Sequence, residues 1–122
     1  MALAITSRTE DNLAIVDLAG SLTLGPSLKT LRDTARELLS GTDLAGFILR
    51  LNEVLTVDSS GLGELTVLYT LAVKRGCPLR LVGVTPKLRQ MLELTRLDAL
   101  LPIATDLATA KKELKKVSGA VR

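Results

Sequence analysis

The 122-residue sequence has no histidine and no tryptophan, and only one cysteine, one phenylalanine and one tyrosine. A serine or cysteine nucleophile usually needs a histidine as its general base, so that kind of catalysis lacks its partner here. The single Cys77 cannot form an internal disulfide and offers no metal-ligand spacing, and we expect it to be structural. A transition-metal site would depend on carboxylates alone. We therefore expect neither an enzyme nor a bound cofactor.

The sequence also lacks long apolar runs. None approaches the ~18 residues that a membrane-spanning helix needs. Residues 1–12 do not show the charged and then apolar pattern of a signal peptide. These absences predict a soluble cytoplasmic protein that is not inserted into a membrane. The length predicts a single domain over residues 1–122.

What the sequence has is aliphatic residues and a mild positive charge of +3. Acidic and basic residues alternate along the chain except in "KKELKK", where Lys111, Lys112, Lys115 and Lys116 would form a basic edge on a helix. This edge has two interpretations, a contact with an acidic partner or nucleic acid and a solvated face of a terminal helix. No aromatic residues accompany the lysines, which favours the solvated face and argues against direct nucleic-acid binding.

The hydrophobic pattern alternates between strand-like and helix-like segments after an opening hairpin. Apolar stripes at helical spacing are expected at Leu28, Leu31, Ala35, Leu38 and Leu39, at Leu62, Leu65, Leu68, Tyr69 and Ala72, and at Leu107, Ala110, Leu114 and Val117. Thr85 is the expected N-cap of its helix. We expect strands at 3–7 and 13–20 with a turn at 8–12, a helix from Pro26 to Gly41, a strand at 46–51 and a loop at 52–61. There follow a helix ending at Gly76, a strand at 77–84, a helix at 85–97, a short strand at 100–103 and a helix from 105 that closes at Gly119. This order predicts the α/β class, with a small, mixed and mostly parallel sheet on which the helices pack.

The stretch "VDSSGLGEL" (57–65) follows a buried strand, where loops of open α/β sheets carry function. If a helix begins near Gly61, its N-terminus favours negative charge beside Ser59 and Ser60. The two serines either cap this helix or present a hydroxyl for phosphorylation. Glu64 is placed to complete a capping box, although a glycine cap cannot reciprocate.

The same stretch resembles the signature of STAS domains, the sulphate-transporter and anti-sigma factor antagonist family. The likeness extends over almost the whole chain, including "GSLTLGPSLKTLR", "GFILRL", "CPLRLVGV" and "MLELTRLDALLPIATDLATAKKEL". It implies the STAS fold, with the serine directly after the aspartate as the phosphorylation site. That serine is Ser59, and its neighbours in the motif are Asp58, Ser60, Gly61, Leu62 and Gly63.

The resemblance also implies partner switching. The unphosphorylated protein would bind an anti-sigma factor serine kinase and so free a sigma factor. The kinase would phosphorylate Ser59 and be released, and a metal-dependent, PP2C-type serine phosphatase would restore the first state. The domain itself would catalyse nothing.

Two positions depart from the family pattern. Antagonists often have an aspartate in the loop after the second strand, where this chain has Thr23, and an acidic or amide residue where it has Arg50. Both departures are expected to make the surface near the site less negative, which favours an unusual kinase. The alternative is a STAS module of another kind, either a non-switching scaffold or an anion-sensing or transporter-associated subunit.

Overall fold

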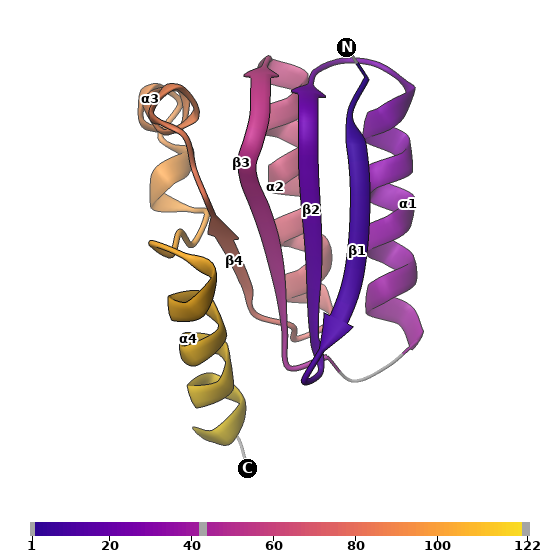
Figure 1. The fold of residues 1–122 in the computed structure, drawn as a ribbon, viewed down its shortest axis with the longest axis vertical. Coiled ribbons are helices and arrows are strands. Elements are labelled where there is room, and N and C mark those ends of the chain that lie inside the picture. Colours follow the sequence, from indigo (N-terminus) through magenta and orange to yellow (C-terminus); the bar gives the residue numbers. More distant parts are fainter. Residues whose placement is uncertain (1, 42–43, 121–122) are drawn as a thin grey trace.

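The computed structural model of the protein describes residues 2–41 and 44–120, with Gly41 and residues 116–120 described in backbone only. In chain order the elements are β1 (Ala4–Glu10), β2 (Leu13–Leu22), α1 (Pro26–Gly41), β3 (Gly46–Val57), α2 (Ser59–Lys74), β4 (Leu79–Val82), α3 (Pro86–Leu94), the short 3-10 helix η1 (Leu97–Ala99) and α4 (Leu107–Ala120). The strands form one four-stranded sheet in the order β1-β2-β3-β4 (Figure 1). β1 and β2 are antiparallel and the other pairs are parallel, so the predicted α/β class is confirmed.

The turn between β1 and β2 is tighter than the sequence predicts. Residues 8–10, expected in the turn, belong to β1 and pair with β2. Asp11 and Asn12 alone make the turn, with φ of 51° and 64°. Aspartate and asparagine tolerate this left-handed conformation better than most residues, and such turns match the twist of a two-residue hairpin.

β3 is longer than the sequence predicts. It runs from Gly46 to Val57, so most of the loop expected at 52–61 is strand. Its pairing with β2 shifts register twice, and at each shift β3 contains an extra residue. Such bulges break the alternation of buried and exposed side chains, which is why this part of β3 does not look like a strand in the sequence.

The elements after β4 follow the expected order with changes in extent. Thr85 is the N-cap of α3, and its Oγ1 accepts the Leu88 N–H at 3.2 Å. The strand expected at 100–103 is reduced to one bridge, between Leu81 and Ile103. The helix at the end of the chain continues past Gly119 to Ala120.

The two faces of the sheet are covered to different extents. One face packs against α1, α2 and α3 in a large aliphatic core that also buries Phe47. The other face packs against α4 through a small cluster, Leu13, Ile15, Ile48, Val82, Ala104, Ala110 and Leu114. The predicted apolar stripes account for the buried helix residues, among them Leu28, Leu31, Ala35, Leu62, Leu65, Leu68 and Ala72. The side chain of Val117, predicted for the stripe of the last helix, lies outside the described residues.

Candidate functional site

Asp58 connects the end of β3 to α2 and ties both to the loop after β2. It is the N-cap of α2, and its Oδ1 accepts the Gly61 N–H at 2.9 Å. Its Oδ2 accepts the Leu24 N–H at 3.0 Å. One carboxylate therefore fixes the first turn of α2 relative to the β2–α1 loop.

Ser59 and Ser60 are the first residues of α2, which begins earlier than the expected start near Gly61. The interpretation in which the serines cap the helix is wrong, because Asp58 is the cap. Ser59 is exposed and Ser60 is partly exposed. Within the described part of the chain, neither hydroxyl forms a hydrogen bond, and the capping interactions are made by Asp58. The helix therefore does not require either hydroxyl for its own start.

The two glycines of the motif, Gly61 and Gly63, have different surroundings. A Cβ on Gly61 would lie 1.9 Å from the carbonyl oxygen of Leu22, so only glycine lets the first turn of α2 approach the end of β2 this closely. A Cβ on Gly63 would meet nothing within 4 Å. Close backbone approach therefore requires a glycine at Gly61 and not at Gly63, which leaves a stretch of open helix surface beside the serines.

Thr23 lies directly beside this first turn. The carbonyl of Leu22, on one side of it, accepts the Asp58 N–H at 3.3 Å. Leu24, on its other side, donates to the Asp58 carboxylate across 34 residues of sequence. The structure therefore brings Thr23, Asp58 and the serines together at the carboxyl edge of the sheet.

Apolar side chains near the motif are both buried and exposed. Leu62 is 4% exposed and belongs to the core, as its place in the apolar stripe predicts. Leu24 and Leu55 are 78% and 60% exposed, and they belong to the two segments that meet at Asp58.

Hydrogen bonds from the backbone hold the pKa of Asp58 below its ordinary value of 3.8, the Leu24 N–H being the larger cause and the Gly61 N–H the next. The carboxylate is therefore ionised at neutral pH. It partly offsets the roughly half positive charge at the N-terminus of α2. A phosphate on Ser59 would add almost two negative charges at this end, on an exposed surface where no core residue is disturbed.

An ion pair between α1 and α2 lies one helical turn from Ser60, and sequence reasoning missed it. Glu64 was expected in a capping box, which is wrong: its carboxylate accepts two hydrogen bonds from the Arg32 guanidinium, at 2.9 and 2.7 Å. The Glu64 side chain is 5% exposed and that of Arg32 is 38% exposed. A signal was present, because Glu64 interrupts the apolar stripe of α2 and a buried carboxylate needs a partner. The sequence did not show which cation that partner is.

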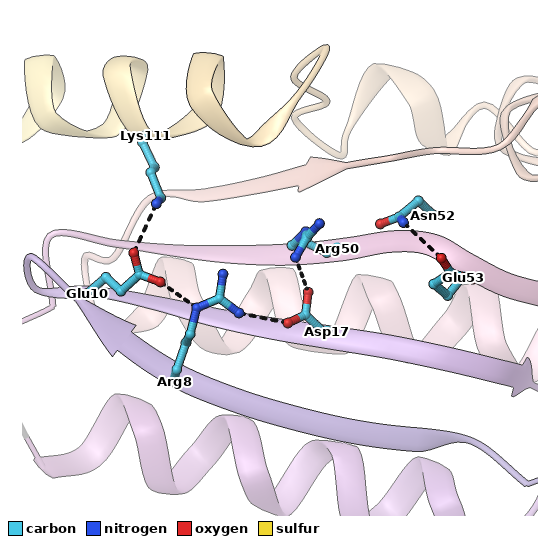
Figure 2. Close-up of polar contacts among 7 residues, drawn as sticks. All are labelled: Arg8, Glu10, Asp17, Arg50, Asn52, Glu53 and Lys111. Atoms are coloured by element: carbon cyan, nitrogen blue, oxygen red, sulfur yellow. Dashed lines mark hydrogen bonds and ion pairs between the residues drawn. The ribbon is translucent and has the colours of Figure 1, made fainter.

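Arg50 does not lie beside the serines. It projects from the middle of β3 on the face that α4 partly covers, and its Nη1 pairs with Asp17 of β2 at 3.0 Å (Figure 2). Asp17 also accepts a hydrogen bond from Arg8 at 2.9 Å, and Arg8 in turn donates to Glu10. The expected effect of Arg50 on the charge near Ser59 is therefore wrong, since Asp17 neutralises it on the face away from α2.

The basic edge predicted at 111–116 is partly used inside the molecule. Lys111 pairs with Glu10 at 3.0 Å and Lys115 pairs with Asp11 at 3.4 Å. Both acids belong to the β1–β2 hairpin, so these lysines fasten α4 to it. The side chain of Lys116 lies outside the described residues.

Over residues 2–41 and 44–120, no group of three or more His, Cys, Asp or Glu residues is placed to hold a metal ion. No helix within the same residues is long and apolar enough to cross a membrane. Cys77 is buried, and burial raises the pKa of its thiol to about 11, so the thiol stays protonated and unreactive at neutral pH.

The fold is thus a small α/β domain with a mixed sheet and an Asp-Ser-Ser-Gly turn at the start of α2. The sequence matches the STAS domain family over residues 4–110, which is most of the chain. The protein belongs to the STAS domain family. Among curated protein sequences, none matches it.

Solved structures share the fold at low sequence identity. A putative anti-sigma factor antagonist from Thermotoga maritima superimposes with a TM-score of 0.81 at 20% identity, covering 91% of this chain and 94% of the other. A serine-to-glutamate variant of Moorella thermoacetica RsbS superimposes with a TM-score of 0.81 at 20% identity, covering 93% of this chain and 97% of the other. A sulfate transporter family protein from Wolinella succinogenes superimposes with a TM-score of 0.70 at 21% identity, covering 88% of each chain. At these identities the likeness concerns the fold alone.

Proposed function

We propose that the protein is an anti-sigma factor antagonist that acts by partner switching, with Ser59 as the phosphorylation site. The unphosphorylated form binds an anti-sigma factor serine kinase, and the kinase then no longer holds its sigma factor. Phosphorylation of Ser59 releases the kinase, and a PP2C-type serine phosphatase restores the binding form. In this scheme the protein is a substrate and a binding surface, and it catalyses no reaction itself.

The observation that carries this proposal is the position of the Ser59 hydroxyl. It is exposed at the first residue of α2, while Asp58 makes the capping hydrogen bonds. A hydroxyl that the fold does not use is free to accept a phosphate without loss of the helix start. The first turn that carries it is nevertheless held in place by the contacts of Asp58 with Gly61 and Leu24.

The surroundings of Ser59 explain how a phosphate would abolish binding. Exposed Leu24, whose N–H binds Asp58, offers apolar contact area to a partner beside the serines. Adding a doubly charged phosphate beside the ionised Asp58 would require the partner to desolvate that charge or to supply cations for it. A partner selected to bind the neutral hydroxyl does neither, so it dissociates while the domain stays folded.

The test is affinity capture from host lysate with four baits: wild type, Ser59→Ala, Ser59→Glu and Ser60→Glu. We expect wild type and Ser59→Ala to retain the same ATP-binding serine kinase and Ser59→Glu to lose it. Ser60→Glu is the matched control, because it adds the same charge at the next residue. ATP should release the kinase from wild type and not from Ser59→Ala, with phosphate mapped to Ser59 by mass spectrometry.

Two results would contradict the proposal. One is phosphate mapped to Ser60 or Thr56 alone in cells with an active kinase. The other is a Ser59→Glu bait that unfolds, as seen by circular dichroism, because Ser59 would then be a structural residue.

A second candidate is a STAS module that does not switch, either a scaffold or a subunit associated with a transporter or an anion. The similarity in fold to the sulfate transporter family protein supports this second candidate. It predicts that wild type and Ser59→Glu retain the same partner, which the capture experiment measures directly.

A further inference from the structure

A surface groove runs between α1 and α2, starting beside the serines. It consists of two hollows, one of about 650 Å³ that reaches Ser60 and one of about 570 Å³ that reaches Lys74. Arg36 lines both, so the two hollows adjoin at this residue. Both helices have 16 residues and follow parallel strands, so they run in the same direction for ~24 Å.

The groove has an apolar lining. Leu28 and Val67 lie in the hollow near the serines, and Leu39 and Leu71 lie in the other. Leu24, which is 78% exposed, lines the end nearest to Ser60. These side chains form a row between the helices, in which Leu28 and Leu39 are buried and Val67 and Leu71 are partly exposed, with polar residues beside it.

The charges that line the groove are unequal. Five basic and three acidic side chains belong to it: Lys29, Arg32, Arg36, Lys74 and Arg75, with Asp33, Glu37 and Glu64. Two of the acids are already neutralised inside the chain, Glu64 by Arg32 and Asp33 by Lys29. Among the described residues, Arg36, Lys74 and Arg75 form no ion pair, so the half of the groove farther from the serines has three cations and one acid, Glu37, and presents an excess of positive charge.

We propose that this groove docks an amphipathic helix with acidic residues, contributed by the protein that binds at Ser59. A groove of this length with an apolar row suits the helix-in-groove mode of recognition, in which leucine-like side chains are spaced at i, i+3, i+4 and i+7. The acidic side chains of the bound helix face Arg36, Lys74 and Arg75, and this complementarity sets its register. The proposal rests on the proposed function only in assigning the helix to the partner of Ser59.

The test uses a 15N-labelled, unphosphorylated protein and a synthetic peptide, with no kinase present. The peptide has about 16 residues, enough for ~24 Å of helix, with Leu at every third or fourth position and Glu between. We expect saturable shifts of amides in α1 and α2 that line the groove. A peptide with Lys in place of Glu is the control for charge and should not bind.

Matched charge reversals locate the binding. Arg36→Glu with Lys74→Glu should weaken the acidic peptide roughly tenfold, through lost attraction and new repulsion. Lys87→Glu with Arg89→Glu makes the same change in net charge on exposed positions of α3 and should alter the dissociation constant by less than about twofold in physiological salt. If the charge reversal unfolds the protein, Arg36→Gln with Lys74→Gln is the milder variant. We expect it to cause an intermediate loss of affinity for the acidic peptide.

Three results would overturn the proposal: shifts that lie outside the groove, equal weakening by both reversals, or no saturable binding of the acidic peptide. Because the peptide experiment involves no kinase and no phosphate, none of these three results bears on phosphorylation of Ser59, which the capture experiment tests. A failed kinase capture, in turn, does not alter the peptide result.

Discussion

Helices α2 and α4 lie on opposite faces of the same sheet and are attached to it in different ways. α2 packs into the large core, and its first turn touches the backbone of β2 at Gly61. α4 has a small apolar cluster and is fastened at its edges by ion pairs, Lys111 with Glu10, Lys115 with Asp11 and Glu113 with Arg80. Apolar burial gives α2 one fixed position, whereas surface ion pairs add little to the stability of α4.

The start of each helix shows the same difference. Both begin with an aspartate whose carboxylate accepts a backbone N–H three residues on, Asp58 from Gly61 and Asp106 from Thr109. Asp58 also accepts an N–H from Leu24 in another segment. The cap of α2 therefore joins two parts of the fold, and the proposed switch is built on the helix that is held more tightly.

The largest effect is expected from the same truncation in each helix. Leu65 in α2 and Leu114 in α4 are both 0% exposed. Leu65→Ala should lower the free energy of unfolding by about 2–5 kcal/mol, a large part of the ~5–15 kcal/mol typical of a domain. Leu114→Ala should lower the free energy of unfolding, measured by urea denaturation, by less than this, because α4 can detach locally. The amides of α4 should then exchange with solvent faster, while those of β2 and β3 stay slow. Equal global losses without local opening of α4 would show that the two attachments are alike.

The next effect concerns the two glycines of α2. Gly61→Ala should destabilise the protein by about 1–3 kcal/mol, because the new methyl group meets the Leu22 carbonyl and the first turn must move. Gly63→Ala should stabilise it by about 0.5–1 kcal/mol, since an open helical glycine gains from alanine. Thermal melts of both variants measure this. A tolerated Gly61→Ala would mean that the close approach to β2 is not needed.

A smaller effect is expected from salt. At about 1 M KCl the Debye length falls to ~3 Å and surface ion pairs are screened. Amides of α4 should then exchange about twofold to fivefold faster, while those of α2 do not change. Glu10→Gln at low salt should reproduce part of this increase, because it removes the partner of Lys111. An α4 that is insensitive to both would be held by its apolar cluster alone.

The smallest effect is a pH dependence at the cap of α2. The pKa of Asp58 is lowered in the folded protein, so the stability it contributes is present above its ordinary pKa of 3.8 and is lost as the pH falls through the lowered value. A carbon-detected NMR titration should therefore place the Asp58 midpoint below 3.8. Asp58→Asn should lose less stability than wild type over the same fall in pH. A midpoint at or above the ordinary value would show that the bridge to Leu24 is not formed in solution.

Much of the fold could be predicted from the sequence because the signals are local. The stripe of Leu28, Leu31 and Ala35, the Thr85 cap and the opening hairpin each depend on residues within a few positions of one another. The end of β3 could not be predicted, because its bulges depend on how it pairs with β2. The strand predicted at 100–103 is reduced to one bridge for a similar reason, because the pairing of Ile103 with Leu81 of β4 depends on a distant segment.

The candidate site was predicted in composition and not in geometry. The sequence placed Asp58, the serines and Thr23 in one region, and the structure brings them together. It did not show that Asp58 alone caps α2, because that depends on the loop at Leu24. The partnership of Arg32 with Glu64 joins two helices, and periodicity within either helix carries no information about it.

The contact of Gly61 with Leu22 also bears on how an enzyme would recognise Ser59. Ser59 stands on a turn whose backbone has little room to shift, so the position of this residue is set during folding and its backbone loses little further entropy at encounter. A kinase acting on it must fit a rigid three-dimensional surface, unlike one that binds an extended tail through a short consensus sequence. A linear peptide containing "VDSSGLGEL" would accordingly be a poor substrate, and recognition would fail whenever the domain is unfolded.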